Sequence, residues 1–337
     1  MSPTDLPDSQ RQIVLAARPQ GLPVPADFAL RRAPIETPES GCVLLRHTHL
    51  GLAPAARVRM GTAASYAPPM ALGDVVFGQA LGVVVATRAP GFAVGDTVMS
   101  MVGGWQEYSL APAAALTRVD PGMAPPTAWL GVLGTSGLTA YVGLLDFGRP
   151  RPGQTVVVSA ASGAVGSAAA QIARIRGCRV VGIAGGPDKC RYAVESLGLD
   201  ACVDHRQPEL GSALRAACPD GVDIYFDNVG GAVRDAVWPL MAQGGRVVVC
   251  GQIAEYNANP HPGPDWFPIV ARRLSLHGFI VSDHLERKPE FLREAGAWVR
   301  EGRLSFRECT YDGLEQTVPA FIAMLQGHHL GKTLVRL

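Results

Sequence analysis

The segment over residues 155–176 constrains the fold most, because it reads as a strand, a tight turn and a helix in immediate succession. β-Branched residues run from Thr155 to Ser159 and stop abruptly at small residues, and an amphipathic helix begins within a few positions. This arrangement places a helix N-terminus, with its free backbone N–H groups, where it can meet a pyrophosphate. The segment predicts an α/β domain that binds a dinucleotide.

The turn itself departs from the full dinucleotide fingerprint. That fingerprint has three glycines, whereas here Ala161 stands at the first place and Gly163 and Gly166 fill the other two. Gly163 lets the backbone approach a pyrophosphate, and Gly166 lets the helix pack closely on its strand. A buried strand–helix turn without any ligand fits the same residues, so the rest of the chain has to decide between the two.

Strand-like apolar runs recur after this turn at a steady interval, and helical stretches such as Lys189–Leu197 and Leu210–Ala217 lie between most of them. Strands that alternate with helices form right-handed crossovers and therefore a parallel sheet. The sequence predicts a doubly wound α/β domain whose ligand crevice lies at the carboxyl ends of the strands. Its six expected strands are Thr155–Ser159, Arg179–Ala184, Ala201–Asp204, Val222–Asp227, Arg246–Cys250 and Leu274–Ile280.

The first 120 residues follow a different pattern, in which short strand-like runs are separated by Gly-Asp and proline-rich connectors. Such spacing predicts a mostly antiparallel barrel. The run Lys332–Arg336, which follows a helix over Glu315–Leu325, is expected to return to this domain. We therefore expect a first domain of residues 1–122 and 304–337, a second of residues 123–303, and a substrate cleft between them. The expected strands of the first domain are Gln12–Ala17, Cys42–Leu50, Leu81–Thr87, Asp96–Met101 and Gln106–Leu110.

The composition is that of a well-buried globular enzyme. Of the 337 residues 47% are hydrophobic and 18% are charged, and the net charge of +1 argues against a nucleic-acid or anionic-membrane partner. No apolar run reaches the roughly 18 residues that a membrane span needs, and the polar N-terminus is not typical of a secretory signal. The seven cysteines include no Cys-x-x-Cys pair. We therefore expect neither a disulfide framework nor a zinc cage, and a cytoplasmic location.

The end of the second expected strand indicates which dinucleotide binds. NAD-binding domains carry an acidic residue there, whereas this strand ends in Gly185-Gly186, which leaves room for a 2′-phosphate. Lys189 follows, and His205-Arg206 come directly after the third strand, near the same corner of the sheet. These features favour NADP over NAD. The alternative is a solvated Lys189 that opens a helix, although a cation at a helix N-terminus is unfavourable unless an anion is also present.

Longer motifs make nearly the whole sequence similar to the zinc-free medium-chain dehydrogenases/reductases. Within that superfamily it resembles the branch that contains prostaglandin reductases, plant 2-alkenal (double-bond) reductases and bacterial curcumin reductase. The resemblance implies a Rossmann domain, a GroES-like domain and a homodimer. It rests on Arg11–Leu15, Arg18–Gly21, Asp27-Phe28, Gly104–Tyr108, Gly137–Tyr141, Ala160–Ser167, Phe226–Gly231, Cys250–Asn257, Gly278–Val281 and Leu330–Lys332.

The residues that a zinc alcohol dehydrogenase uses are missing. Such an enzyme needs a cysteine in its early strand, a Gly-His-Glu segment and a lobe of four closely spaced cysteines. The corresponding places here hold Leu50-Gly51-Leu52 and Gly78-Gln79-Ala80. His47 and His49 alternate on one strand but lack a cysteine or carboxylate that would complete a ligand set. We expect no metal in this protein.

The resemblance implies NADPH-dependent reduction of the carbon–carbon double bond of an α,β-unsaturated aldehyde or ketone. The carbonyl already polarises that bond, so hydride can add to the β-carbon without a metal if the protein positions the alkene and stabilises the enolate. A quinone reductase of the same superfamily, and an NADPH-binding protein or cyclase without net hydride transfer, are the alternatives. The implied cofactor residues are Thr139, Ala164, Val165, Gly166, Ser167, Gly185, Lys189, His205, Asn228, Cys250, Gly251, Ile253, Tyr256, Phe279, Ile280, Val281 and His329.

On the substrate side, Tyr256 is the candidate catalytic residue. A phenol with a pKa of about 10 stays protonated at neutral pH and can donate a proton to the enolate, although a tyrosine that only packs its ring is the alternative. The branch usually has Asp-Pro-Tyr-Met-Arg where this chain has Ala53–Arg57, so a tyrosine of the family is replaced by Ala55. We expect Ala55, Tyr256 and Trp266 to line a wide pocket that accepts a bulky substrate.

Overall fold

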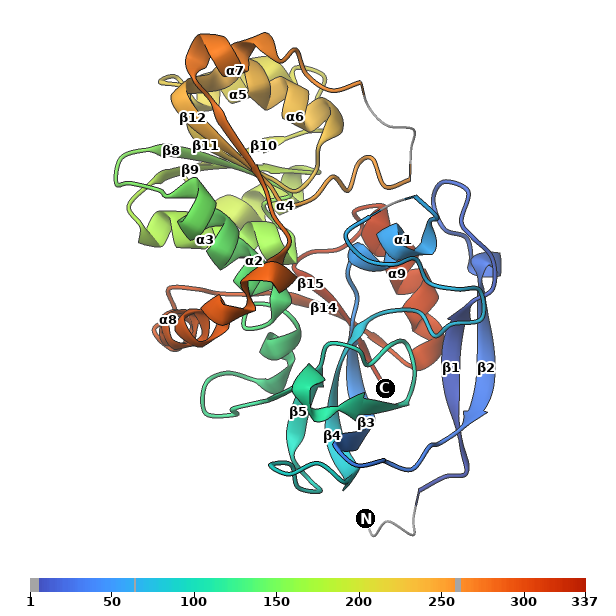
Figure 1. Ribbon diagram of the computed structural model, residues 1–337. Helices are drawn as coiled ribbons and strands as arrows, with labels where there is room; N and C mark the ends of the chain where they lie inside the picture. Colours follow the sequence, from blue (N-terminus) through green and yellow to red (C-terminus); the bar gives the residue numbers. More distant parts are fainter. Residues whose placement is uncertain (1–5, 64, 258–261) are drawn as a thin grey trace. The chain divides into compact units, whose positions relative to one another are not determined.

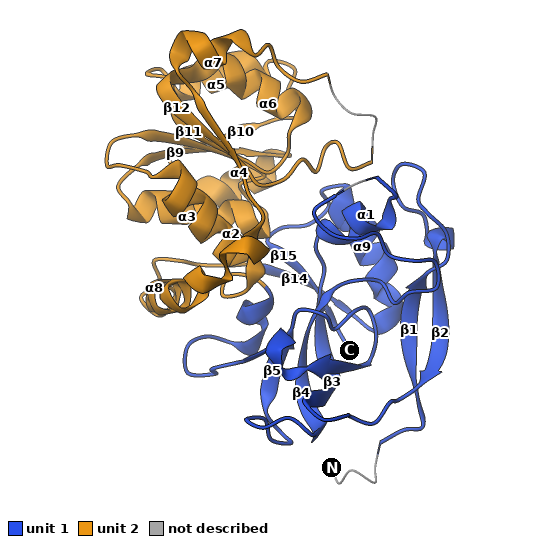
Figure 2. Cartoon of the chain, viewed as in Figure 1, with its two compact units in different colours: residues 1–130, 308–337 blue, residues 131–307 orange. Residues whose placement is uncertain are grey.

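The computed structural model describes residues 6–63, 65–257 and 262–337. The chain forms two compact units, shown in Figures 1 and 2. Unit 1 comprises Met1–Leu130 and Glu308–Leu337, and unit 2 comprises Gly131–Arg307. Unit 2 is therefore one continuous stretch of chain, whereas unit 1 is assembled from both ends of it.

Unit 2 is built on a six-stranded sheet in which every neighbouring pair of strands is parallel, as predicted. The sheet order is β10-β9-β8-β11-β12-β13, so the chain begins at the centre of the sheet and reverses direction beside β8. The carboxyl ends of β8 and β11 lie at that reversal, where doubly wound folds bind their ligands. The strands are β8 (Thr155–Ser159), β9 (Arg179–Ala184), β10 (Ala201–Asp204), β11 (Val222–Asp227), β12 (Met241–Val249) and β13 (Ser275–Gly278).

Helices connect these strands. The helix that follows the first strand, α3, buries its alanine-rich face, and small side chains there let it approach β8 and β9 closely. Val157, Val181 and Tyr225, which are inaccessible to solvent, belong to a sheet core that packs against the helices over Leu210–Ala217 and Gly231–Val237. The helices of unit 2 are α2 (Thr135–Val142), α3 (Ala164–Ile175), α4 (Pro187–Arg191), α5 (Leu210–Ala217), α6 (Gly231–Val237), α7 (Phe267–Arg272) and α8 (Lys288–Arg300).

Unit 1 is mostly antiparallel, as predicted. Two strands form a separate pair, and seven form a sheet of order β14-β15-β3-β4-β5-β7, with β6 also paired to β3. The C-terminal strand β15 pairs with β3, so the tail does return to this unit, and only its pairing with β14 is parallel. The elements are β1 (Ser9–Leu15), β2 (Phe28–Pro34), β3 (Cys42–Gly51), α1 (Ala55–Met60), β4 (Gln79–Thr87), β5 (Thr97–Ser100), β6 (Tyr108–Pro112), β7 (Leu116–Arg118), β14 (Glu308–Asp312), α9 (Thr317–Leu325) and β15 (Lys332–Arg336).

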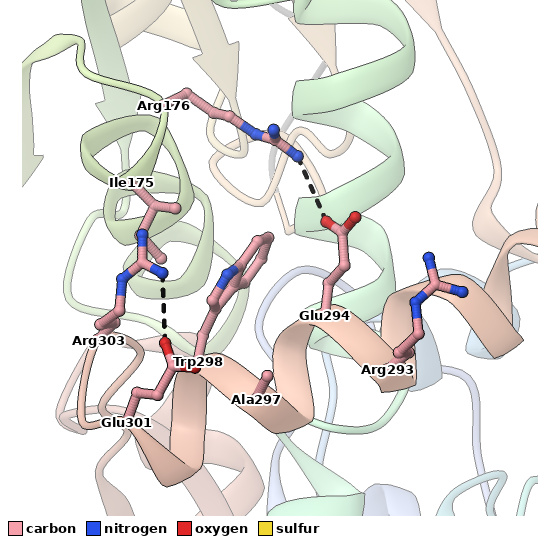
Figure 3. Close-up of a pocket in the computed structure, with 8 residues that line it drawn as sticks. All are labelled: Ile175, Arg176, Arg293, Glu294, Ala297, Trp298, Glu301 and Arg303. Atoms are coloured by element: carbon pink, nitrogen blue, oxygen red, sulfur yellow. Dashed lines mark hydrogen bonds and ion pairs between the residues drawn. The ribbon is translucent and has the colours of Figure 1, made fainter.

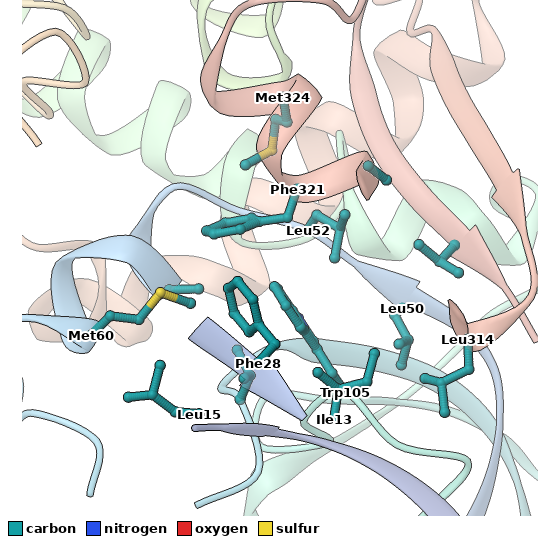
Figure 4. Packing of buried hydrophobic residues seen from close by; sticks show 14 of the residues in the cluster. Ile13, Leu15, Phe28, Leu50, Leu52, Met60, Trp105, Leu314, Phe321 and Met324 are labelled. Atoms are coloured by element: carbon teal, nitrogen blue, oxygen red, sulfur yellow. The ribbon is translucent and has the colours of Figure 1, made fainter. Parts of the chain in front are cut away.

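An aromatic cluster forms the centre of the unit 1 core (Figure 4). The ring of Trp105 stacks on Phe28 at a centroid distance of 5.7 Å and meets the edge of Phe321 at 5.0 Å. Burial of each such side chain contributes about 1.5–3 kcal/mol. Because Phe321 comes from α9, this cluster ties the C-terminal part of the chain to the N-terminal strands of the same unit.

Candidate cofactor and active site

The turn after β8 is shaped to bring α3 against its strand. A Cβ on Gly166 would lie 2.2 Å from the backbone oxygen of Ala160, so only glycine fits there. Gly163 takes the N-cap position of α3 in an extended conformation, and no side chain caps the helix. The amides of the first helical turn therefore point outward without a capping side chain, as a pyrophosphate needs. The sequence-predicted residues Ala164, Val165, Gly166 and Ser167 all lie in this first turn.

Cationic side chains gather at the ends of β9 and β10. A Cβ on Gly185 would lie 2.9 Å from His205 Nε2 and 3.1 Å from Arg206 Nε, so the glycine makes room for both side chains. Burial, and next the charge of Arg206, lower the pKa of Lys189, which shows that the two cations lie within electrostatic reach. Burial also lowers the pKa of His205. This group of basic side chains fits a 2′-phosphate.

One carboxylate organises the loop that carries these cations. Asp204 Oδ1 accepts hydrogen bonds from the backbone N–H groups of Gly186 at 2.8 Å and of Arg206 at 3.0 Å. These hydrogen bonds lower the pKa of Asp204 despite an opposing contribution from burial. The carboxylate therefore fixes the backbone on both sides of this corner, at Gly186 and at Arg206. The sequence places His205 and Arg206 together at this corner, but the implied cofactor residues include His205 and not Arg206.

A buried hydrogen-bond network joins the carboxyl ends of β8 and β11. Asp227 Oδ1 accepts from the hydroxyl groups of Tyr225 at 2.8 Å and Ser159 at 3.1 Å, and from the amides of Val229 and Gly230. Burial, followed by the charge of Asp227, raises the pKa of Tyr225 well above its usual value. The network holds the β11 loop rigidly beside β8.

Asn228 is engaged on both sides of its amide. Its Nδ2 donates to the backbone oxygen of Ser159 at 2.7 Å, and its Oδ1 accepts the Cys250 thiol at 2.9 Å. Burial raises the pKa of Cys250, so this sulfur is a neutral donor. The structure thus brings Asn228 and Cys250 together, with their side chains directed at each other and at the backbone.

The loop after β12 folds back, so that the Tyr256 hydroxyl lies beside the first residues of the loop. The Tyr256 hydroxyl oxygen accepts the backbone N–H of Gln252 at 3.3 Å, and a Cβ on Gly251 would lie 3.3 Å from that oxygen. Backbone hydrogen bonds from Ile253 to Asn228 and from Ala254 to Val229 fasten this loop to the loop after β11. Tyr256, Gly251, Ile253 and Asn228 therefore occupy one corner of unit 2.

The remaining predicted residues are divided between the units. Phe279 and Ile280 follow β13, with Val281 at the start of the next helical turn, and Phe279 packs on Gly143, where a Cβ would lie 2.7 Å from its ring. Thr139 bonds within α2 to the Thr135 carbonyl at 2.7 Å. Trp266 is 57% exposed and lies edge-on to Trp238.

In unit 1, Ala55 is the first residue of α1, and His329 precedes β15. The roles of Ala55 and His329 toward a ligand stay predictions.

The unit 1 residues weighed as metal ligands, and the segment that replaces Gly-His-Glu, have other structural uses. Both ring nitrogens of His47 are hydrogen-bonded, to the Gln106 carbonyl at 2.8 Å and the Ser109 hydroxyl at 2.7 Å. Burial lowers the pKa of His47 to about 4, so the ring is neutral. A Cβ on Gly78 would lie 2.8 Å from the Trp105 indole. Within residues 6–63, 65–257 and 262–337, no three His, Cys, Asp or Glu residues are grouped so as to hold a metal ion.

A pocket of about 460 Å³ lies elsewhere on unit 2, between the end of α3 and α8 (Figure 3). Two of its three arginines form ion pairs there, Arg176 with Glu294 and Arg303 with Glu301, both at 3.3 Å. None of the predicted site residues lines this pocket. The candidate site is therefore the strand-end region described above. In the described part of the chain, no helix is both long and apolar enough to cross a membrane.

Comparison with known proteins gives the same picture. Residues 11–119 match the family described as the N-terminal domain of oxidoreductase, and residues 164–297 match the zinc-binding dehydrogenase family. NADPH-dependent curcumin reductase of Escherichia coli is 44% identical, covering 97% of this chain and 96% of that protein. Prostaglandin reductase 1 of Rattus norvegicus is 37% identical over 94% of this chain and 96% of its own length.

The solved structure of CurA from Vibrio vulnificus in complex with NADPH superposes with a TM-score of 0.92. It is 42% identical and covers 97% of this chain and 98% of that one. Together with the uncapped α3 turn and the cations at the ends of β9 and β10, these matches identify the family. The chain belongs to the zinc-free branch of the medium-chain dehydrogenase/reductase superfamily that includes the curcumin, prostaglandin and 2-alkenal reductases.

Proposed function

We propose that this protein uses NADPH to reduce the carbon–carbon double bond of α,β-unsaturated ketones and aldehydes. The observation that carries the proposal is the pairing of an uncapped α3 N-terminus with the basic side chains of Lys189, His205 and Arg206, which suits a dinucleotide that bears a 2′-phosphate. The NADPH-dependent curcumin reductase and the CurA–NADPH complex support the choice of cofactor. When bound, NADPH supplies the hydride that adds to the β-carbon of the substrate.

We assign the proton-transfer role to Tyr256. The backbone N–H of Gln252 donates to the phenol oxygen, and a donor at that oxygen stabilises negative charge on it. The phenol is thereby made a better hydrogen-bond and proton donor to an enolate, while a water molecule is the other source of that proton. Asn228 is assigned a positioning role, because its amide holds the β8 backbone and Cys250.

We further propose that the substrate is bulky. Support comes from Ala55, which begins α1 at a place where the family usually has a tyrosine. An alanine there removes an aromatic ring from the expected substrate wall. Under this proposal the specificity constant rises with the size of the enone.

A homodimer and a cytoplasmic location complete the proposal. The strand β13 ends the sheet of unit 2, and an unpaired edge strand is a surface on which another chain can pair. Apolar side chains lie nearby on α7, where Phe267 is 69% exposed and Val270 is 71% exposed. The seven cysteines are all free thiols, which suits a reducing compartment.

The test is an NADPH-oxidation screen across enones graded by size, with quinones included, on the wild type and the Tyr256→Phe variant. We expect turnover with enones, the highest specificity constants for large ones, and a loss of kcat in Tyr256→Phe. Unchanged turnover in this variant removes Tyr256 from the mechanism, and higher specificity constants for short 2-alkenals contradict the wide pocket. Activity with quinones alone supports the quinone reductase. Tight NADPH binding without oxidation supports a protein that transfers no hydride.

A further inference from the structure

Two thiols from different elements meet on one face of the parallel sheet of unit 2. Cys202 lies in the edge strand β10, opposite Gly182 of β9. A Cβ on Gly182 would lie 3.2 Å from the Cys202 sulfur, so this glycine leaves the space that the sulfur needs. Cys190 lies in α4, which follows β9 and packs against β10. A hydrogen bond joins the side chains of Cys190 and Cys202.

The surroundings make Cys190 the more acidic of the two thiols. The Cys202 thiol donates to the Cys190 sulfur, and the backbone N–H of Ala184 donates to the same sulfur. Both contacts stabilise a thiolate and lower the pKa of Cys190, whereas the pKa of Cys202 is raised. Thiolate character and access to solvent govern oxidation, and both residues are half-buried beside the sheet edge.

Other cysteines of this unit have the opposite character. Burial raises the pKa of Cys178 and of Cys218 to about 11, and it also raises that of Cys250. A neutral, buried thiol reacts slowly with oxidants. Within this comparison, the Cys190–Cys202 pair combines an attacking sulfur with a neighbour that can resolve the product.

We propose that Cys190 and Cys202 form a peroxide-sensitive dithiol, and that its oxidation to a disulfide weakens NADPH binding at the 2′-phosphate. The Cys190 thiolate attacks hydrogen peroxide, so a sulfur–oxygen bond forms, the oxygen–oxygen bond breaks, and the departing hydroxide takes up the proton that the Cys190 thiol released, giving water. The Cys202 sulfur then attacks Cys190, forming the disulfide, and hydroxide leaves with the Cys202 proton as a second water. Two thiols lose two electrons in total, and one peroxide is reduced to two waters.

The pair is connected to the cations at both of its ends. Lys189 is the residue before Cys190, and Asp204, which holds the amides of Gly186 and Arg206, is two residues after Cys202. A disulfide holds its sulfurs at about 2 Å, closer than a hydrogen-bonded pair of thiols. Its formation therefore draws α4 toward β10 and displaces Lys189 from Arg206. This coupling rests on the proposed 2′-phosphate site, and NADH, which lacks that phosphate, should not sense it.

The experiment treats the reduced full-length protein with hydrogen peroxide, removes the excess, and alkylates the remaining thiols. Peptide mass spectrometry then locates linked cysteines, and kcat/KM is measured with NADPH and with NADH. We expect a Cys190–Cys202 linked peptide and, from the loss of one charge-assisted hydrogen bond, about a tenfold fall in kcat/KM for NADPH. The value for NADH should stay within about twofold, and a dithiol reductant should restore the NADPH value.

The variants separate the two parts of the proposal. Cys190→Ser and Cys202→Ser should lose the response to peroxide, whereas Cys42→Ser, which changes a half-buried cysteine of unit 1, should respond like the wild type. Recovery of both thiols in alkylated form, or a link to another cysteine, overturns the dithiol. A disulfide that changes NADPH and NADH kinetics equally, or neither, overturns the coupling. If reduced Arg206→Ala keeps the full preference for NADPH, the proposed phosphate site fails independently of the disulfide.

Discussion

The Nζ atom of Lys332 lies 2.8 Å from the backbone oxygen of Leu52, in a part of unit 1 where the lysine side chain is fully buried. Burial lowers the pKa of this amine to about 8 from the ordinary 10.5. Burial of the charged amine lowers the stability of the fold, because a single backbone carbonyl replaces the water molecules that would solvate it. The arrangement predicts an unusual dependence of stability on pH.

We expect the free energy of unfolding to rise between pH 8 and pH 10.5 through Lys332. In that window the unfolded chain binds the proton more tightly than the folded one, so deprotonation favours the folded state, by up to about 3 kcal/mol. Below pH 8 the Lys332 amine is charged in both states, so its burial lowers the free energy of unfolding by the full amount. Urea unfolding of the wild type and Lys332→Met across this range checks the prediction. The variant should lose this rise, and identical pH profiles for the two proteins would contradict it.

Replacement of Gly166 by alanine should disrupt the cofactor turn. The added Cβ would lie 2.2 Å from the Ala160 oxygen, so α3 must move away from β8. We expect a loss of stability of about 1–3 kcal/mol from this overpacking, with NADPH binding weakened beyond that. The matched control for the loss of stability is Gly163→Ala, whose Cβ would lie 3.3 Å from the same oxygen. Thermal unfolding measures the stability of both variants, and fluorescence titration measures NADPH binding to Gly166→Ala. Equal unfolding temperatures for the two variants count against the close approach.

Arg206 and Lys189 should determine the preference for NADPH over NADH. Removal of either cation takes away one charge-assisted contact to the phosphate, so each alanine variant should reduce that preference by about tenfold. The control is Arg191→Ala, because Arg191 is exposed and pairs with Asp188 at 3.0 Å. The measurement is the ratio of kcat/KM values for the two cofactors. A fall in both values with no change in their ratio would indicate structural damage instead of lost phosphate binding.

Ser159→Ala should loosen the end of β8. The hydroxyl donates to Asp227 at 3.1 Å and accepts a hydrogen bond from the backbone N–H of Asn228 at 2.8 Å, inside a buried network. Its removal leaves a buried donor without its partner, which costs about 1–3 kcal/mol. Denaturant unfolding should show a lower midpoint at an unchanged slope. Ser282→Ala, in the helical turn after β13, is the surface comparison, and a wild-type midpoint in Ser159→Ala would refute the importance of the network.

The parallel sheet was predictable because buried β-branched runs alternate with helices. The exact start of one of its strands, and one strand of the unit 1 sheet, were not predictable. The strand β12 begins at Met241, five residues before the expected Arg246, because the Gly244-Gly245 pair hides its start. The strand β14 was not expected at all. Its Glu308–Asp312 stretch is polar and lacks a clear alternating pattern, and only its parallel pairing with β15 makes it a strand.

Within the candidate site, local motifs were readable and contacts across strands were not. The glycine turn predicts α3 because strand, turn and helix are consecutive in sequence. Two other contacts depend instead on the register between β9 and β10. They are the hydrogen bond from the Gly186 amide to Asp204 and the contact between Cys190 and Cys202. Register is fixed by the packing of whole strands. No single stretch of sequence carries that information.

The position of β15 between β14 and β3 has a consequence for biogenesis. Unit 2 is complete once Arg307 has been synthesised, but unit 1 still lacks β14, α9 and β15, the strand that joins β14 to β3. Domains generally fold as units while the chain emerges. The portion of the protein that is translated first must therefore wait for these C-terminal elements before it can close, so truncation after Arg307 leaves the sequence of unit 2 whole but removes β14, α9 and β15 from unit 1.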